Sequence, residues 1–177
     1  PEVFPLGETI VTWTTTDVMQ NISTMEQKII LTDSIFPRVD IPEDIIIEAT
    51  SINENTVSFT EPEVYDHVKI ESLSNDAPEF FPIGETIVTW LVSDSSGNIG
   101  TSSHKVIVLD SIPPEITVTD ITIEATIHNG SDALLSMPEI NDIQEVYITN
   151  DAPEVFPLGE TIVTWTAKDQ SDNESTQ

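Results

Sequence analysis

Aspartate–asparagine pairs four residues apart are the clearest candidates for chemistry in this sequence. They are Asp17 and Asn21, Asp94 and Asn98, and Asp169 and Asn173. Two further aspartates, Asp33 and Asp110, each begin a copy of the triplet Asp-Ser-Ile. Carboxylate and amide oxygens are hard ligands of the kind that Ca²⁺ binds, about six to eight at a time. With few lysines and arginines nearby, these residues predict calcium sites.

The same pairs also suit a tight turn without metal. An aspartate accepts hydrogen bonds from the backbone of its own turn, and a glycine or asparagine takes the left-handed position. Gly97 is replaced by Gln20 and Asp172 in the other copies, which weakens the case for a strict metal motif. The sequence leaves both interpretations open.

Three asparagines stand in N-glycosylation sequons, Asn-X-Ser or Asn-X-Thr. They are Asn21, Asn129 and Asn173. All three fall in expected loops, so we expect glycan there if the protein is exposed at a cell surface. The sequence does not decide whether the sequons are used.

Catalytic chemistry has little support. His67, His104 and His128 stand in unrelated contexts without metalloprotease spacing, and no glycine-rich phosphate loop occurs. Abundant serines and aspartates do not make a triad by themselves. We expect no enzyme activity and no cofactor other than Ca²⁺.

The composition narrows the class of protein. The chain has 177 residues, 32 acidic and five basic side chains, a formal charge of −27 and no cysteine. This charge argues against nucleic acid and anionic lipid as partners. Disulfides are excluded, and no apolar run approaches the ~18 residues of a membrane span. Since 38% of the residues are apolar, we expect a folded core.

Internal repeats set the organisation. FPLGETIVTW at residues 4–13 and 156–165 and FPIGETIVTW at 81–90 are separated by 77 and 75 residues. We expect residues 1–33 to be the C-terminal part of a preceding repeat and 34–110 a complete one. Residues 111–177 should form a repeat that lacks its last strand.

Because PEVFPLGETIVTWT occurs at both 1–14 and 153–166, we expect a segment of a longer array. A rival hypothesis is strand exchange between chains. The shared strand argues against it, since only the last strand would need to be donated.

The apolar pattern predicts strands. Val88, Trp90 and Val92 alternate with a second set whose equivalent in the last copy ends in Lys168, so the tryptophan set should be buried. Turn residues recur between short β-branched runs. This is typical of a small antiparallel sandwich of about seven strands, with one tryptophan per core.

The pattern F-P-[LI]-G-E-T-x-V-T-W, followed by D-x-x-x-N and a V-x-V-x-D-S-x-x-P linker, resembles the hyalin repeat (HYR) family. The resemblance implies tandem immunoglobulin-like β-sandwiches in extracellular or cell-surface proteins, and it implies adhesion rather than catalysis. Many HYR repeats carry a cysteine pair, which is missing here near His67 and Ser102. In this the chain resembles prokaryotic versions of the repeat.

An immunoglobulin-like topology places the Asp–Asn hairpin where the chain enters the domain. Asp33 should then approach Asp94 and Asn98, and Asp110 should approach Asp169 and Asn173. The loops at Glu8 and Glu85 should lie over the same joints. Similar inter-domain loops bind Ca²⁺ in bacterial adhesins, which favours calcium here.

The expected function is structural. We expect a tandem segment of an extracellular filament, fibre or surface layer, with proline-stiffened linkers at 33–37 and 110–114. The alternative is the rigid stalk of an adhesin whose binding head lies outside this chain. Its partners would be copies of itself or other surface proteins and glycans, without direct membrane insertion.

Overall fold

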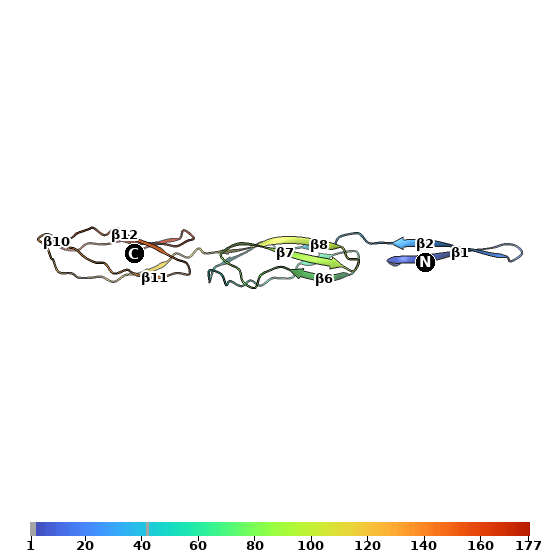
Figure 1. Cartoon of the computed structure of the whole chain (residues 1–177), viewed down its shortest axis with the longest axis horizontal. Coiled ribbons are helices and arrows are strands. Elements are labelled where there is room, and N and C mark those ends of the chain that lie inside the picture. The colour runs from blue at the N-terminus through green and yellow to red at the C-terminus, as the bar shows by residue number, and fades with distance from the viewer. Residues whose placement is uncertain (1–2, 42) are drawn as a thin grey trace. The chain divides into compact units, whose positions relative to one another are not determined.

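The computed structural model describes residues 3–41 and 43–177, and these residues form strands and loops without helices. The predicted all-β fold is therefore confirmed (Figure 1). Among the described residues no helix is long and apolar enough to cross a membrane.

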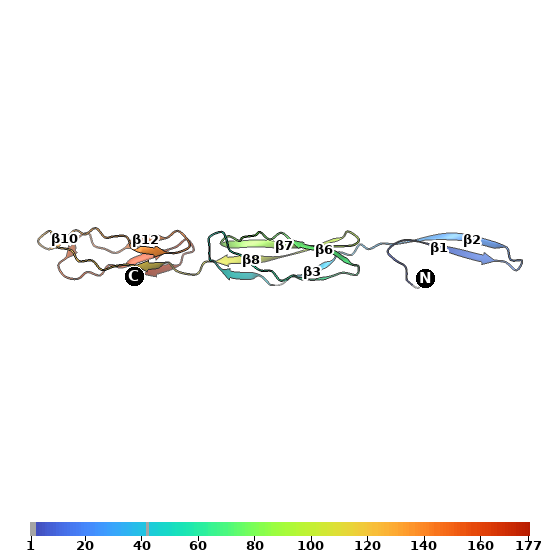
Figure 2. The same ribbon diagram turned by 90° about the horizontal axis from the view of Figure 1, so that it is seen from below.

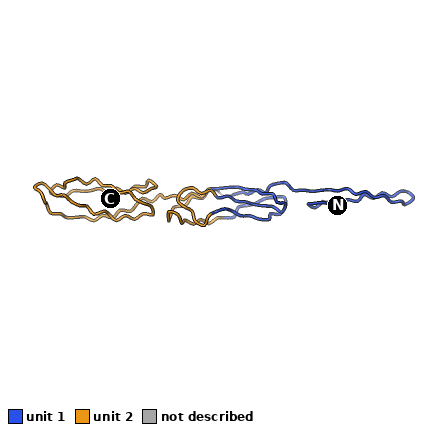
Figure 3. Tube along the Cα trace, in the orientation of Figure 1, with its two compact units in different colours: residues 1–43, 60–77, 88–104 blue, residues 44–59, 78–87, 105–177 orange. Residues whose placement is uncertain are grey.

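Contacts divide the chain into two compact units (Figure 3). The first unit comprises residues 1–43, 60–77 and 88–104, and the second comprises residues 44–59, 78–87 and 105–177. This division differs from the repeat boundaries expected from the sequence. Those repeat boundaries stay a prediction.

The first unit begins with a hairpin of β1 (Gly7–Thr16) and β2 (Ile22–Leu31) (Figure 2). Its register runs from Gly7 opposite Leu31 to Thr16 opposite Ile22. The two strands form a sheet of their own. Trp13 is 62% exposed, whereas the equivalent Trp90 is 3% exposed. The hairpin thus presents an apolar face that its own strands do not cover.

Two sheets follow. β3 (Arg38–Asp40) pairs with β5 (Glu63–Tyr65) in one. The other has the order β4 (Ile45–Glu48), β8 (Ile99–Leu109), β7 (Gly84–Asp94), β6 (Ile70–Asn75). β4 runs parallel to β8, so the expectation of a purely antiparallel sandwich is wrong at this edge. The chain thus forms β3 in the first sheet and then passes to the second sheet, where it forms β4.

The predicted alternation holds in β7. Val88, Trp90 and Val92 are buried, while Ile87 and Leu91 face solvent. β4 behaves alike: Ile46 is exposed, while Ile45 and Ile47 are half-buried. The inward set is therefore the one that the repeats identified.

The C-terminal strands are short. β9 (Glu115–Thr117) pairs with β11 (Glu139–Asn141), and β10 (Gly130–Ser131) with β13 (Phe156–Pro157). β12 (Tyr147–Asn150), β14 (Trp165–Lys168) and β15 (Glu174–Thr176) form a third sheet. Ile116 of β9 and Trp165 and Ala167 of β14 form a buried core cluster, packed against residues that include Leu135, Ile140 and Ile148.

One predicted strand is missing from this region. Residues 120–126 repeat the β4 sequence but form no strand, and Ile121 and Ile123 are 52% and 45% exposed. In the other copy β4 pairs with the second half of β8. Among the described residues, no strand pairs with 120–126 in the way that β8 pairs with β4.

Replacing Trp90 with alanine should lower the free energy of unfolding by about 3–5 kcal/mol, because a fully packed indole is lost. Leu91→Ala, one residue along β7 and 40% exposed, is the matched control and should change it by less than about 1 kcal/mol. Urea denaturation followed by circular dichroism measures both. Equal losses in the two variants would contradict the assigned inward face.

Candidate functional site

Three aspartates in the first unit bring their carboxylates together. Asp33 precedes β3, Asp66 follows β5 and Asp94 ends β7. One oxygen of each lies within 4.8 Å of the others. We call this group the first aspartate triad. It joins segments that are about thirty residues apart in the sequence, and Asp94 is buried.

The Asp94–Asn98 turn fixes one side of this triad. Asp94 Oδ1 accepts hydrogen bonds from the backbone N–H groups of Ser96 at 2.8 Å and Asn98 at 2.9 Å. The Asn98 amide donates to Asp94 Oδ2 at 2.7 Å and, at longer range, to Asp33 Oδ2 at 3.3 Å. The expected approach of Asp33 to Asp94 and Asn98 is thus present. Asn98 holds the two carboxylates through its nitrogen.

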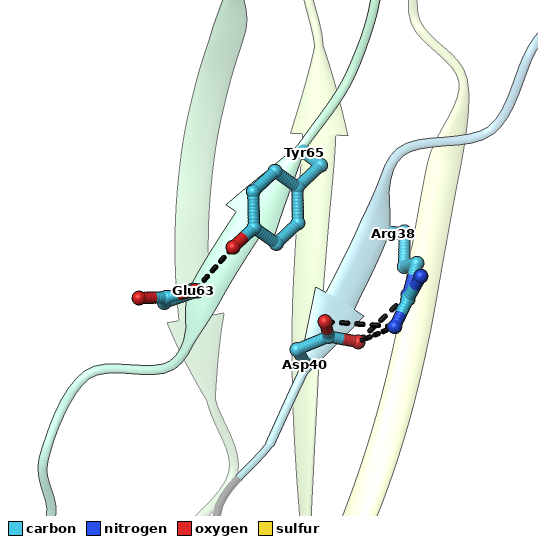
Figure 4. A network of polar contacts seen from close by, with 4 residues as sticks. All are labelled: Arg38, Asp40, Glu63 and Tyr65. Carbon is cyan, nitrogen blue, oxygen red and sulfur yellow. Dashed lines mark hydrogen bonds and ion pairs between the residues drawn. The ribbon is translucent and has the colours of Figure 1, made fainter.

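Asp66 is the member that the sequence analysis missed. On β3 and β5, Arg38 binds Asp40 and the Tyr65 hydroxyl donates to Glu63 on one face (Figure 4). The strand alternation turns Asp66 the other way. Its Oδ1 accepts from the His67 backbone at 2.6 Å, and its Oδ2 is buried without a hydrogen-bond partner. Such an oxygen is suited to a cation.

The second unit repeats the arrangement. Asp110, Asp142 and Asp169 form the second aspartate triad, again with oxygens within 4.8 Å of one another. Asn173 donates to Asp169 Oδ2 at 2.8 Å and to the Asp110 carbonyl at 3.1 Å. Asp142 was also missed. Its signal is the recurrence of Pro-Glu-[Val/Ile]-x-Asp at 62–66 and 138–142.

The second triad contains an amide that the first lacks. Gln144 Nε2 donates to Asp110 Oδ2 at 2.6 Å and to Ser171 Oγ at 2.5 Å. The equivalent residue in the first triad is Val68. A carboxamide that turns over presents its oxygen instead of its nitrogen, so Gln144 can serve either a bare carboxylate or a bound cation.

Other predicted ligands lie elsewhere. Asp17 and Asn21 form the same turn, with the Asn21 amide donating to Asp17 Oδ2 at 2.8 Å, but both are exposed and belong to neither triad. Glu8 pairs with Lys28 at 2.8 Å and Glu85 with Lys105 at 2.9 Å. The structure therefore does not bring Glu8 or Glu85 into the clusters.

The turn interpretation and the metal interpretation are compatible. Gln20, Gly97 and Asp172 occupy the same turn position, and all have positive φ, at 65°, 89° and 70°. Only glycine adopts this conformation without steric cost. The turn keeps the same hydrogen bonds to its aspartate in all three copies, and a metal site also requires such a fixed carboxylate.

The triads have no basic partner. All five lysines and arginines lie in the described part of the chain, and each pairs with an acid outside the triads. The pairs are Lys28–Glu8, Arg38–Asp40, Lys69–Glu71, Lys105–Glu85 and Lys168–Asp172. Burial acts to raise the pKa of Asp94, but hydrogen bonds from Asn98 and Ser96 outweigh it and hold that pKa below its ordinary 3.8. The carboxylate oxygens of the triads are ligands that fit a hard divalent cation.

The asparagines of the three sequons differ in how accessible their side-chain amides are. The side-chain nitrogens of Asn21 and Asn173, the atoms that glycan would modify, donate hydrogen bonds inside their turns. Asn129 lies exposed just before β10. The three positions are therefore not equivalent as acceptors.

The repeated all-β units with acidic turns define a tandem β-sandwich repeat protein. Residues 32–108 match the family model of the HYR domain, as the motifs predicted.

Hyalin from Lytechinus variegatus is 33% identical over 184 residues, which cover 95% of this chain and 35% of that protein. Hyalin from Strongylocentrotus purpuratus is 33% identical over 189 residues, covering 97% and 16%.

A Rattus norvegicus protein named for sushi, von Willebrand factor type A, EGF and pentraxin domains is 35% identical over 107 residues, or 56% of this chain and 3% of that protein. The chain spans about a third of the first hyalin and about a sixth of the second. The prokaryotic origin expected from the missing cysteines stays a prediction.

Asn98→Leu should raise the pKa of Asp94, because the amide that stabilises the ionised form is lost. Since the folded-state pKa lies below the unfolded value, the stability it contributes is present at neutral pH. That contribution is lost as the pH falls through the depressed folded value. Carboxyl NMR titration measures the pKa directly. Asn53→Leu, at an exposed asparagine, is the control and should leave it unchanged; an unmoved Asp94 titration in Asn98→Leu contradicts the assignment.

Proposed function

We propose that this chain is a non-catalytic structural segment of an extracellular adhesion-type protein. The observation that carries the proposal is the HYR match together with 33% identity to two hyalins over almost the whole chain. A net charge of −27 without cysteine suits a solvated segment that needs no disulfides. A structural role of this kind does not depend on converting a substrate.

Within that class, we propose that the chain serves a filament, fibre or surface layer. Near-identical repeats favour this role, because an assembly that grows by addition reuses one interface many times. The alternative is an adhesin stalk, which needs no such interface. Electron microscopy of the purified protein separates them: regular fibres support the filament, and dispersed particles support the stalk.

We propose Ca²⁺ as the ligand of both aspartate triads. Each triad combines three carboxylates from distant segments with no basic partner, and in the first triad the buried Asp66 Oδ2 lacks a donor. A divalent ion would relieve the repulsion and tie the segment before β3 or β9 to the Asp–Asn turn. Backbone carbonyls and water would complete the coordination.

Calcium should therefore stabilise the fold. Millimolar Ca²⁺ is expected to raise the melting temperature by roughly 5–10 °C over the chelated protein, because the ion binds only the native arrangement. Isothermal titration calorimetry should find two sites per chain, one of which is lost in Asp66→Asn and the other in Asp142→Asn. Superimposable melting curves with Ca²⁺ and with chelator would overturn the proposal.

The control for these variants is Asp132→Asn, an exposed aspartate outside both triads. It removes the same charge and should keep both calcium sites. Mg²⁺ at the same concentration should have the smaller effect, because it requires a tighter octahedral shell. If Ca²⁺ acted only by general charge screening, it would instead raise the melting temperature of all three variants equally.

We also propose Asn129 as the preferred glycan acceptor. Protein secreted from a eukaryotic cell should carry one N-glycan by intact-mass measurement, and Asn129→Gln should remove it. Asn21→Gln and Asn173→Gln are the comparison, since their amides are engaged in turns. Glycan retained in Asn129→Gln would contradict this preference.

A further inference from the structure

The two aspartate triads differ in the side chain that lies beside them. In the second triad, Gln144 stands where the first triad has Val68. Gln144 Nε2 donates one hydrogen bond to Asp110 Oδ2 at 2.6 Å and another to Ser171 Oγ at 2.5 Å. A valine side chain has no hydrogen-bond donor. The second triad therefore has an internal amide donor at a position where the first triad has an apolar side chain.

The backbone fixes Gln144 next to the triad. Its N–H donates to Asp142 Oδ1 at 2.7 Å, so the glutamine shares a turn with one of the three aspartates. Gln144 and Asp142 are half-buried, and Asp110 and Asp169 are buried. A hydrogen bond to a carboxylate is stronger in such a site than in water, because the local dielectric constant is lower. The amide is thus well placed to stabilise the charge of Asp110.

The first triad satisfies its carboxylates less completely. Asp33, which corresponds to Asp110, accepts a longer hydrogen bond from the Asn98 amide at 3.3 Å. Asp66 Oδ2 is buried without a hydrogen-bond partner. A buried carboxylate oxygen without a donor costs free energy, and neighbouring carboxylates repel one another. A bound cation would remove both costs.

The partners of Gln144 have counterparts in the first triad. By the repeat, Asp110 corresponds to Asp33 and Ser171 to Ser96. A glutamine at position 68 would therefore find the same two kinds of partner that Gln144 has. The donor itself is the part of this arrangement that the first triad lacks, and it can be moved from one triad to the other by a single substitution in each.

We propose that the Gln144 amide takes the place of a cation in the second triad and makes this triad bind Ca²⁺ more weakly than the first. The inference rests on the calcium function proposed above. The amide nitrogen lies within hydrogen-bond distance of Asp110 Oδ2, so an ion can bind that oxygen only after displacing the amide. The first triad has no such competitor and depends on the ion instead.

Turning over the carboxamide does not remove this competition. Gln144 would then offer Oε1 to the ion, but Nε2 would first give up both of its hydrogen bonds, including the one to the carboxylate of Asp110. A hydrogen bond to a charged group is among the stronger ones in proteins, and its loss weakens binding by about tenfold or more. We therefore expect the second triad to have the lower calcium affinity.

The two triads would then respond to different calcium concentrations. At an intermediate concentration, the ion occupies the first triad, while the second keeps its shape through Gln144. The segment that leads into β9 stays tied to the turn of Asp169 and Asn173 without calcium. The segment before β3 needs the ion for the corresponding connection.

Exchange of the two side chains tests this difference. Isothermal titration calorimetry of the full chain with Ca²⁺ should find the first site at least about tenfold tighter than the second. Gln144→Val should tighten the second site by a similar factor, and Val68→Gln should weaken the first. Asp66→Asn and Asp142→Asn, which each remove one site, assign the two affinities to the two triads.

Thermal melting in chelator gives a readout without calcium. Gln144→Val should lower the melting temperature by about 5 °C, because Asp110 loses its donor. Val68→Gln should raise it, since the new amide can bind Asp33. The matched control is Gln170→Val, which removes an exposed carboxamide near the same turn. It should leave the melting temperature and both calcium affinities unchanged.

The outcomes separate this inference from the calcium function itself. If neither triad binds Ca²⁺, the calcium function fails and this inference fails with it. If both triads bind with equal affinity and the exchanges change nothing, the calcium function stands and the role of Gln144 is refuted. Loss of the second site in Gln144→Val would also refute that role, because the glutamine would then be a calcium ligand through its oxygen.

Discussion

The complete repeat depends on the pairing of β8 with the strands on both of its sides. It lies between β4 and β7 and is hydrogen-bonded on both edges. It buries Val106 and Val108, and it ends at Leu109, directly before Asp110 of the second aspartate triad. Residues 120–126 repeat the β4 sequence, but they are not paired with a strand in the part of the chain that the structure describes, and they form no strand themselves. The amino-acid sequence of this segment alone therefore does not make it an edge strand of the sheet. It also needs a neighbouring strand with which it can pair.

The aspartate triads follow from the same arrangement. Asp94 and Asp169 sit at the turn that leads into the last strand, Asp33 and Asp110 at the point where the previous last strand ends, and Asp66 and Asp142 just after a short strand of the other sheet. Each position is set by backbone pairing, so acids distant in sequence meet without a local metal-binding loop. The protein pairs its five cations with acids elsewhere, so no lysine or arginine pairs with the triads.

Much of this could be predicted from the repeats. They identified the inward face of β7, the Asp–Asn turns and the approach of Asp33 to Asn98, because each of these is local or recurs at one spacing. Asp66 and Asp142 were missed because their role depends on β5 and β11 lying beside the linker, which no short-range pattern shows. Glu8 and Glu85 each bind a lysine on the adjacent strand and are not brought to the aspartates, so their expected place at the joints stays a prediction. The parallel β4–β8 pair also required knowledge of how the chain passes between sheets.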